Sequence, residues 1–284
     1  MRLAVGCAMW THKAWPWHSV PAADRLRAYA GSCDAVEGNT TFYATPSPVT
    51  ARSWADQVGP EFRFVPKFPR TVTHDRRFSG VEKDVRAFLD AVEPLGSRAW
   101  ALWVQLPSAF APADVPALGA FLRRLPRSFR YAVEVRHPSF FEDVTAAGAL
   151  EQVLTASGAE WIPFDTTEFF RTPPGSDAER DAWTKKPRVA RRATALTDRP
   201  IVRYLGRDDP ARTVSGWQPW AETVAAWLRE GRSPTVFVHT PDNADAPELA
   251  RRFHADVRTR VPALEPLPRP VAVQPDPIET LRLF

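Results

Sequence analysis

The segment "DAVEGNTTFYATP" (residues 34–46) contains side chains whose types and spacing suit chemistry. It begins like a buried strand and then carries Glu37, Asn39 and Thr41 at alternate positions. Side chains two apart on a strand point to the same side, so these three are predicted to share one face near the strand end. A glutamate whose pKa is raised by partial burial can carry a proton, which makes Glu37 a candidate acid–base residue.

Similar polar residues stand at the ends of other apolar runs. Glu134 and Arg136 share one face of "YAVEVRH" and alternate with valines. The other strand-end residues are Trp10, His12, Lys67, Gln105, Asp165, Arg203 and His239. One such residue alone would typically form a surface ion pair, but burying many together costs free energy unless they pair or bind a ligand. We therefore expect a polar ligand site at these ends.

The predicted site combines proton carriers with anion-binding cations. Glu37, Glu134, His74 and Lys67 are the candidate catalytic residues. The other candidates, which would contact the ligand, are Trp10, Asn39, Tyr43, Gln105, Arg136, Asp165, Arg203 and Asn243. Lys67 and the two arginines would hold a carboxylate or phosphate. A hydrolase, lyase or isomerase would each fit, with a Schiff base at Lys67 as a less favoured variant.

Metal and cofactor signals are weak. The sequence lacks H-E-x-x-H and clustered Cys/His spacing, so no metal ligand is predicted, and no cofactor is assigned. Cys7 and Cys33 are read as buried free thiols. With no signal peptide and no apolar run long enough to span a membrane, the protein is expected to be cytoplasmic.

A second interpretation is a nucleic-acid-binding protein. Aromatic residues near the strand ends offer a surface for stacking bases, although packing between loops and outer helices is the favoured explanation. The stretch "WTKKPRVARR" (183–192) is strongly basic and lies in the long link between two expected strands. It could supply positive charge beside the site, or merely form a solvated helix face.

The elements that must position these residues are strands alternating with helices. The expected strands are residues 3–10, 35–42, 62–68, 100–106, 131–137, 161–165, 201–206 and 235–240. They start roughly 28 to 40 residues apart, the size of a βα unit. Eight such units predict a single (β/α)₈ TIM barrel over residues 1–261, with its site at the carboxyl ends of the strands. Residues 262–284 are predicted to be a Pro-rich C-terminal tail.

The chain resembles the YecE-like family, bacterial proteins without an assigned activity. The resemblance rests on "VEGNTTFYATP", "FRFVPKFPRTVTHD", "QLPSAFAP", "YAVEVRHPSFF", "KKPRV", "VRYLGRDD" and "FVHTPDNADAPELARRF". It implies a TIM barrel and a shared pocket at Glu37, Asn39, Tyr43, Lys67, His74, Gln105, Glu134, Arg136 and Arg203. Many members read Arg-Leu-His-Gly where this chain has Leu205 before Gly206, and Asn243 is expected to replace an asparagine of their eighth strand.

The last five residues, "TLRLF" (280–284), resemble the short peptides with which bacterial polymerases and repair proteins dock on the sliding clamp. Leu281, Leu283 and Phe284 match the apolar positions, whereas Thr280 stands where those peptides usually have glutamine. Clamp docking is therefore a candidate partner interaction, alongside a small anionic ligand and nucleic acid. Packing of the terminal Leu-Phe on outer helices is the simpler alternative.

Overall fold

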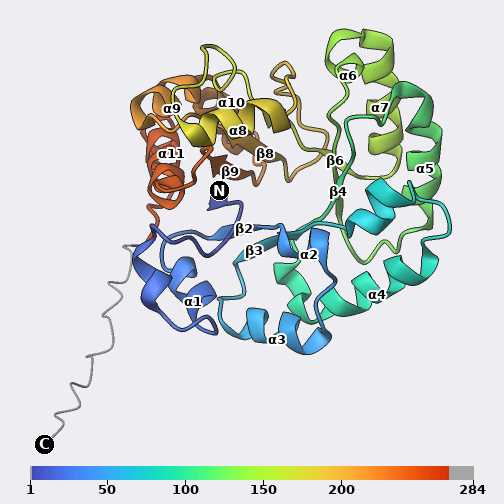
Figure 1. Ribbon diagram of the computed structural model, residues 1–284, viewed down its shortest axis with the longest axis horizontal. Coiled ribbons are helices and arrows are strands. Elements are labelled where there is room, and N and C mark those ends of the chain that lie inside the picture. Colours follow the sequence, from blue (N-terminus) through green and yellow to red (C-terminus); the bar gives the residue numbers. More distant parts are fainter. Residues whose placement is uncertain (1, 269–284) are drawn as a thin grey trace, which may run out of the picture.

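Short parallel strands alternate with helices in the computed structural model, which describes residues 2–268 (Figure 1). The strands are β1 Ala4–Cys7, β2 Ala35–Gly38, β3 Arg63–Pro66, β4 Leu102–Gln105, β5 Tyr131–Glu134, β6 Glu160–Trp161, β7 Phe164–Asp165, β8 Ile201–Leu205 and β9 Thr235–His239. The helices are α1 Arg25–Ala30, α2 Thr40–Tyr43, α3 Pro48–Asp56, α4 Glu82–Val92, α5 Val115–Arg124, α6 Ser139–Glu142, α7 Val144–Ala156, α8 Asp177–Lys185, α9 Pro210–Gly216, α10 Gln218–Arg229 and α11 Ala246–Arg260. Shorter turns are η1 Pro16–Ser19, η2 Thr71–Asp75, η3 Glu93–Arg98 and η4 Pro112–Asp114.

The strands pair in parallel as two sheets. One has the order β3-β2-β1-β9-β8-β7 and the other the order β4-β5-β6. The α/β class with parallel strands is confirmed, and every strand falls in or beside an expected range. The single closed barrel is not confirmed, because the described residues pair as two sheets rather than one ring.

Two interruptions separate the sheets. Between β3 and β4 only isolated bridges occur, Phe64 to Ala99 and Lys67 to Trp103. Between β6 and β7 the chain passes through Ile162 and Pro163. Proline has no N–H to donate to a strand ladder, which explains why pairing breaks there.

Helices lie around the strands, and apolar residues fill both sides of the sheets (Figure 1). A separate inner cluster consists of Ala4, Ala35, Val65, Ala101, Trp103, Ala132, Ile162, Ile201 and Phe237, which come from both sheets. Strand contact is closest at Gly6, where an added Cβ would lie 1.9 Å from the Ala35 carbonyl oxygen. A side chain at that position would push β1 and β2 apart.

The expected strand over residues 35–42 is too long. The strand ends at Gly38, and α2 begins at Thr40. Asn39 and Thr41 therefore do not share a strand face with Glu37. The Asn39 amide donates to the Ala8 carbonyl oxygen (2.8 Å), and the Thr41 hydroxyl donates to backbone oxygens, so both side chains contribute to the turn.

The first residues beyond the expected domain boundary at 261 pack against the helices. Leu264 is buried, Leu267 packs on the core, and Arg251 of α11 donates to the Pro268 carbonyl oxygen (2.7 Å). The rest of the Pro-rich segment, including the proposed clamp-docking residues Leu281, Leu283 and Phe284, lies outside the described residues. Within residues 2–268, none of the helices has the length and apolarity that crossing a membrane would require.

Candidate functional site

The centre of the candidate site is a buried ion pair between β2 and β3. Lys67, directly after β3, places Nζ 2.6 Å from Oε1 of Glu37, and both side chains are almost fully enclosed. The ammonium also donates to Oε1 of Gln105 at the end of β4 (2.7 Å). Parallel strands bring their carboxyl ends to one edge, which is why residues far apart in the sequence meet here.

The second oxygen of Glu37 has two further partners. Nε of Arg203 on β8 lies 3.0 Å from Oε2, and Nε2 of His239, at the end of β9, lies 2.9 Å from it. Since a carboxylate can only accept, the His239 nitrogen facing it carries the proton and donates. Glu37 thus links three strands besides its own.

Glu134 extends the network to the other sheet. Its Oε1 accepts from Nε of Arg136 (2.6 Å), and its Oε2 lies 3.5 Å from Nη1 of Arg203. Arg203 therefore stands between the two buried carboxylates. Its guanidinium lies over the Phe164 ring at 4.2 Å, and the Lys67 ammonium lies over the Trp103 ring at 4.4 Å, so aromatic faces line this network.

Both carboxylates are held ionised. Burial alone would raise the pKa of Glu37, but Arg203 and Lys67 outweigh it and hold this pKa well below its usual value. Burial likewise opposes ionisation of Glu134, and the charges of Arg136 and Arg203 nevertheless lower its pKa. These glutamates are therefore anions that orient and balance neighbouring cations. As proton donors they are poorly suited.

For Lys67, in contrast, the effect of burial on the pKa outweighs the effect of the neighbouring charges. Burial lowers its pKa to about 7, even though Glu37 works in the other direction. Both the ammonium and the amine are consequently populated near neutral pH. Among the four candidate catalytic residues, Lys67 has the pKa best matched to proton transfer at that pH.

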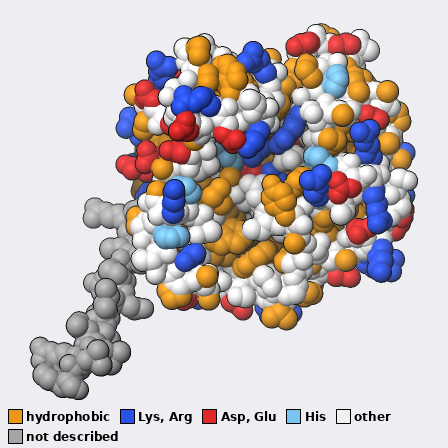
Figure 2. All heavy atoms as spheres, viewed as in Figure 1, with side chains coloured by type: hydrophobic (Ala, Val, Ile, Leu, Met, Phe, Trp, Pro, Cys, Tyr) orange, Lys and Arg blue, Asp and Glu red, His pale blue; other side chains and the backbone are white. Residues whose placement is uncertain are grey.

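His74 and Lys186 lie at the edge of the network. Burial, with Arg136 and Arg70 beside it, lowers the pKa of His74 to about 4, so this ring is neutral near pH 7. Its Nδ1 lies 2.8 Å from the Thr73 hydroxyl. Burial and the charges of Arg203 and Arg136 lower the pKa of Lys186 to about 8. Lysine and arginine side chains gather beside a hollow near the middle of this face (Figure 2).

Three other predicted residues lie apart from the network. The Asp165 carboxylate accepts a hydrogen bond from the indole of Trp220 on α10 (2.6 Å). It therefore points toward α10 and away from the charge network. Trp10 packs edge to face against Trp54, and Tyr43 is 76% exposed. The structure gives these residues packing or surface roles and does not bring them into contact with Glu37.

Asn243, expected to contact a ligand, lies in the loop after β9 with a φ of 54°. Its backbone oxygen accepts from the Trp15 indole (3.0 Å). Its side-chain oxygen is buried without a hydrogen-bond partner among residues 2–268. This residue shapes the loop, and no contact joins it to the network.

Sequence reasoning placed Gln105, Lys67, Arg136 and Arg203 with the two glutamates, and the structure brings these six together. His239 was recognised as a strand-end residue but was given no role as a catalytic or ligand-binding residue, although the structure places it against Glu37. Sequence reasoning also treated Lys186 only as part of a basic stretch. No local pattern distinguishes Lys186 from Lys185, since the difference depends on how the link folds.

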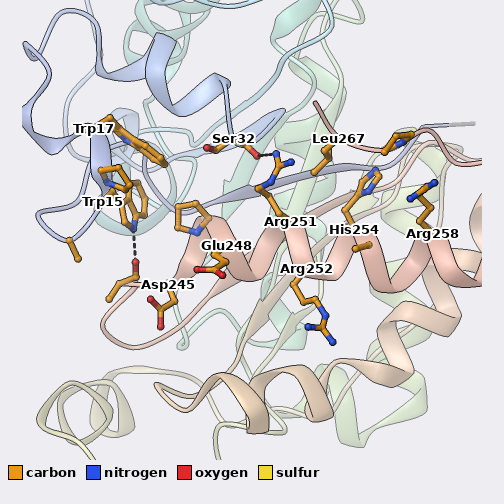
Figure 3. A pocket seen from close by; sticks show the side chains of 16 residues that line it. Trp15, Trp17, Ser32, Asp245, Glu248, Arg251, Arg252, His254, Arg258 and Leu267 are labelled. Atoms are coloured by element: carbon orange, nitrogen blue, oxygen red, sulfur yellow. Dashed lines mark hydrogen bonds between the residues drawn. The ribbon is translucent and has the colours of Figure 1, made fainter. Parts of the chain in front are cut away.

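A cavity of about 790 Å³ is lined by α11 and by residues 14–17 (Figure 3). Trp15, Trp17 and Leu267 supply apolar surface, whereas Asp245, Glu248 and Arg251 are charged, and Arg251 donates to the Ser32 carbonyl oxygen (2.9 Å). None of the residues that line this cavity belongs to the charge network. In the described part of the chain, no group of three or more His, Cys, Asp or Glu side chains is arranged to hold a metal ion.

Fold and site together define an α/β protein with a buried charge network at the carboxyl ends of parallel strands. Residues 4–272 match the model of a family described as "Protein of unknown function DUF72". The chain belongs to this family. The predicted resemblance to YecE-like proteins is thereby confirmed.

The relatives are similar over almost their whole length. The UPF0759 proteins YecE of Escherichia coli K12 and of strain O157:H7 are each 36% identical over 264 residues, covering 93% of this chain and 96% of theirs. Two crystal structures of a DUF72 family protein from Enterococcus faecalis V583 superpose with TM-scores of 0.65 and 0.66 at 18% and 15% identity. These cover 92% and 96% of this chain, and 98% and 100% of theirs, and support the fold.

Proposed function

We propose that the charge network is the ligand site of an enzyme acting on a small anionic substrate. The observation that carries the proposal is an imbalance of charge. Arg136, Lys186 and Arg203, together with Lys67 in its ammonium form, face only two carboxylates, Glu37 and Glu134. Buried cations in excess repel one another, and an anion that binds among them relieves this repulsion.

The hydrogen-bonding pattern supports the same conclusion. Nη1 of Arg203 faces Oε2 of Glu134 at 3.5 Å without a hydrogen bond between them, and neither atom has a hydrogen-bond partner among the described residues. Buried polar groups usually have partners, so an unsatisfied donor beside excess positive charge suits a ligand oxygen. Arg136, whose side chain is 19% exposed, gives such a ligand access to solvent.

Lys67 is the proposed proton carrier. Its pKa near 7 allows the amine to take a proton from a bound substrate and the ammonium to return one. Glu37 holds Nζ in place and stabilises the ammonium that forms. Proton abstraction beside a carbonyl group, as in isomerases and lyases, fits this arrangement, and the same amine could form a Schiff base.

We also propose that the two sheets close into a (β/α)₈ barrel around the inner cluster. Support comes from the bridges between β3 and β4, and from residues of both sheets that pack together. Only Ile162 and Pro163 separate β6, which pairs with β5, from β7, which pairs with β8. The site would then lie at the carboxyl-terminal mouth, where barrel enzymes bind substrates.

The test is calorimetric titration with inorganic phosphate and with acetate at constant ionic strength. Wild type should bind at least one of them, and Arg136→Gln should weaken binding roughly tenfold because it removes a charge-assisted hydrogen bond. Arg76→Gln is the matched control, since Arg76 forms an exposed ion pair with Asp84. If wild type binds neither anion, the proposal is wrong.

No observation among the described residues favours the nucleic-acid alternative. Four of the five basic residues in 185–192 have protein partners: Lys185 pairs with Asp181 and Arg192 with Glu151, while Arg188 and Arg191 lie over aromatic rings. The alternative stays a prediction, as does clamp docking. Binding of labelled DNA that falls steeply with salt would favour it over the small-anion proposal.

A further inference from the structure

The long link between β7 and β8, residues 166–200, is fastened to the strand ends. Thr166, fully buried next to the end of β7, donates its hydroxyl hydrogen to the Pro187 carbonyl oxygen (2.9 Å). Val189 is buried two residues further on. The chain directly after α8 is therefore fixed beside β7, whose Phe164 ring lies against the Arg203 guanidinium of the site.

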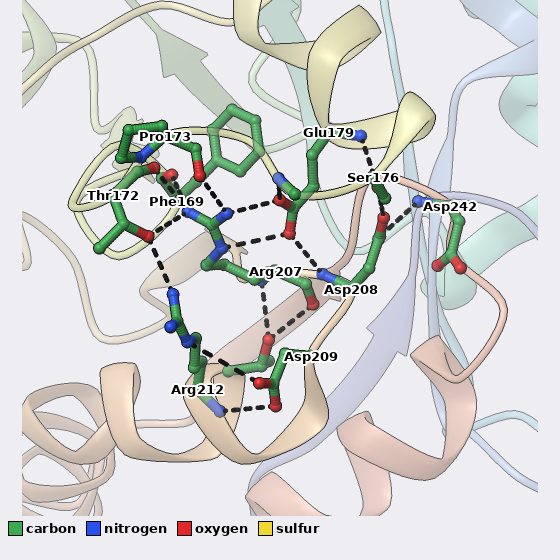
Figure 4. A network of polar contacts seen from close by, with 12 residues as sticks. Phe169, Thr172, Pro173, Ser176, Glu179, Arg207, Asp208, Asp209, Arg212 and Asp242 are labelled. Atoms are coloured by element: carbon green, nitrogen blue, oxygen red, sulfur yellow. Dashed lines mark hydrogen bonds and ion pairs between the residues drawn. The ribbon is translucent and has the colours of Figure 1, made fainter.

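A buried arginine ties the rest of the link to neighbouring loops (Figure 4). Arg207, in the loop after β8, is 3% exposed and forms an ion pair with Glu179 of α8. It also donates to the carbonyl oxygens of Phe169 (3.0 Å) and Thr172 (2.7 Å). It donates as well to the Thr172 hydroxyl (2.9 Å) and to the Pro173 carbonyl oxygen (2.9 Å), so several points of the link are held by one side chain.

Two neighbouring lysines at the end of α8 consequently have different surroundings. Lys185 pairs with Asp181 on the exposed side of the helix, and its side chain is 65% exposed. Lys186 is partly buried, and its charge interacts with Arg203, Arg136, Glu37 and Glu134. Within residues 2–268, Lys186 forms no ion pair with a carboxylate. Its backbone adjoins Pro187, which the Thr166 hydroxyl holds beside the end of β7.

We propose that Lys186 contacts the second negative charge of a dianionic phosphate group bound by Arg136 and Arg203. This inference rests on the proposed function and names its substrate class, phosphate monoesters. Glu37 and Glu134 balance the charges of the two arginines, and the Lys67 ammonium adds an excess of one, which a singly charged group would neutralise without a further cation. A doubly charged tetrahedral group offers oxygens in several directions, so an ammonium approaching from the link can reach one that the arginines leave free.

The test compares sulfate with methyl sulfate, which share a tetrahedral oxyanion but differ by one charge that does not titrate near neutral pH. Dissociation constants are measured by calorimetry at constant ionic strength for wild type, Lys186→Met and Lys185→Met. Lys186→Met should weaken sulfate binding roughly tenfold and methyl sulfate binding much less. Lys185→Met should match wild type, and Lys186→Arg should retain the preference for sulfate.

The outcomes separate the two proposals. If wild type and Lys186→Met prefer sulfate equally while Arg136→Gln loses binding, the role of Lys186 is wrong and the anion site stands. If wild type binds phosphate or acetate but neither sulfate nor methyl sulfate, this inference fails and the anion site stands. If it binds none of the four anions, the proposed function fails as well. Circular dichroism of each variant shows whether a lost preference reflects lost folding.

Discussion

At the scale of single residues, the charge network depends most on Glu37. One of its oxygens faces Lys67, and the other faces both Arg203 and His239. The Glu37 side chain is completely buried, so water cannot take its place beside these partners. Removing the negative charge of Glu37 would leave the buried cations Lys67 and Arg203 without part of the negative charge that balances them.

Glu37→Gln should therefore destabilise the protein by about 3–5 kcal/mol, the range for breaking a buried ion pair by removing one partner. Urea unfolding of wild type and variant measures this difference. The matched control is Glu222→Gln, because Glu222 forms a surface pair with Arg260 and its side chain is 64% exposed. Equal loss of stability in both variants would contradict a special role for Glu37.

The residues that sequence reasoning placed correctly, such as Lys67 and Glu134, directly follow or end parallel strands. Their position alone brings them to one edge, whatever the loops do. Asp165 failed because strand side chains alternate: Phe164 faces the arginines, which sends Asp165 toward Trp220. The interruption before Phe164 decides which of the two faces inward, and no local pattern reveals that.

At the scale of elements, the link between β7 and β8 was recognised only as long and basic. Its fold depends on Arg207 and Glu179, which lie 28 residues apart and in no periodic pattern. Such a pair is visible only once the chain has folded. The strand ranges were easier to predict, because short β-branched and aromatic runs repeat at the spacing of βα units.

Arg207→Met should loosen this link while the strands remain folded. The substitution leaves the Glu179 carboxylate and the carbonyl oxygen of Phe169 without their cation, at a local cost of about 3–5 kcal/mol. Trypsin cleavage after Lys185 and faster hydrogen exchange in residues 166–200 measure the effect. Arg76→Met is the control, since Arg76 bonds to Gly80 and Asp84, both outside the link, and its side chain is 55% exposed. Unchanged cleavage in Arg207→Met would show that Arg207 does not hold the link.

At the scale of the whole molecule, buried histidines make stability depend on pH. Burial lowers the pKa of both His239 and His254 to about 4, from 6.5. Between these values the unfolded chain binds protons that the folded protein excludes, so stability rises with pH across this window and is lost on acidification. The lowered pKa values of Glu37 and Glu134 act in the same direction below about 4.5.

His254→Leu should flatten this dependence, because His254 lies in α11 and is 3% exposed. The loss of unfolding free energy between pH 6.5 and pH 4.5 should shrink by about 1–2 kcal/mol relative to wild type. Urea unfolding at several pH values gives the comparison. His18→Gln, at an exposed position, is the control and should leave the pH dependence of stability unchanged. If His254→Leu also leaves it unchanged, His254 does not cause the loss of stability in acid.

Because strand pairing is interrupted on both sides of the β4-β5-β6 sheet, the charge network connects two sheets. Gln105 and Glu134 belong to this three-stranded sheet, whereas Glu37 and Arg203 belong to the six-stranded one. An anion shared by Arg136 and Arg203 would join two bodies that few backbone hydrogen bonds connect. If the ligand binds only the closed arrangement, opening and ligand dissociation are linked equilibria, so a substitution weakens binding to the extent that it populates the open arrangement.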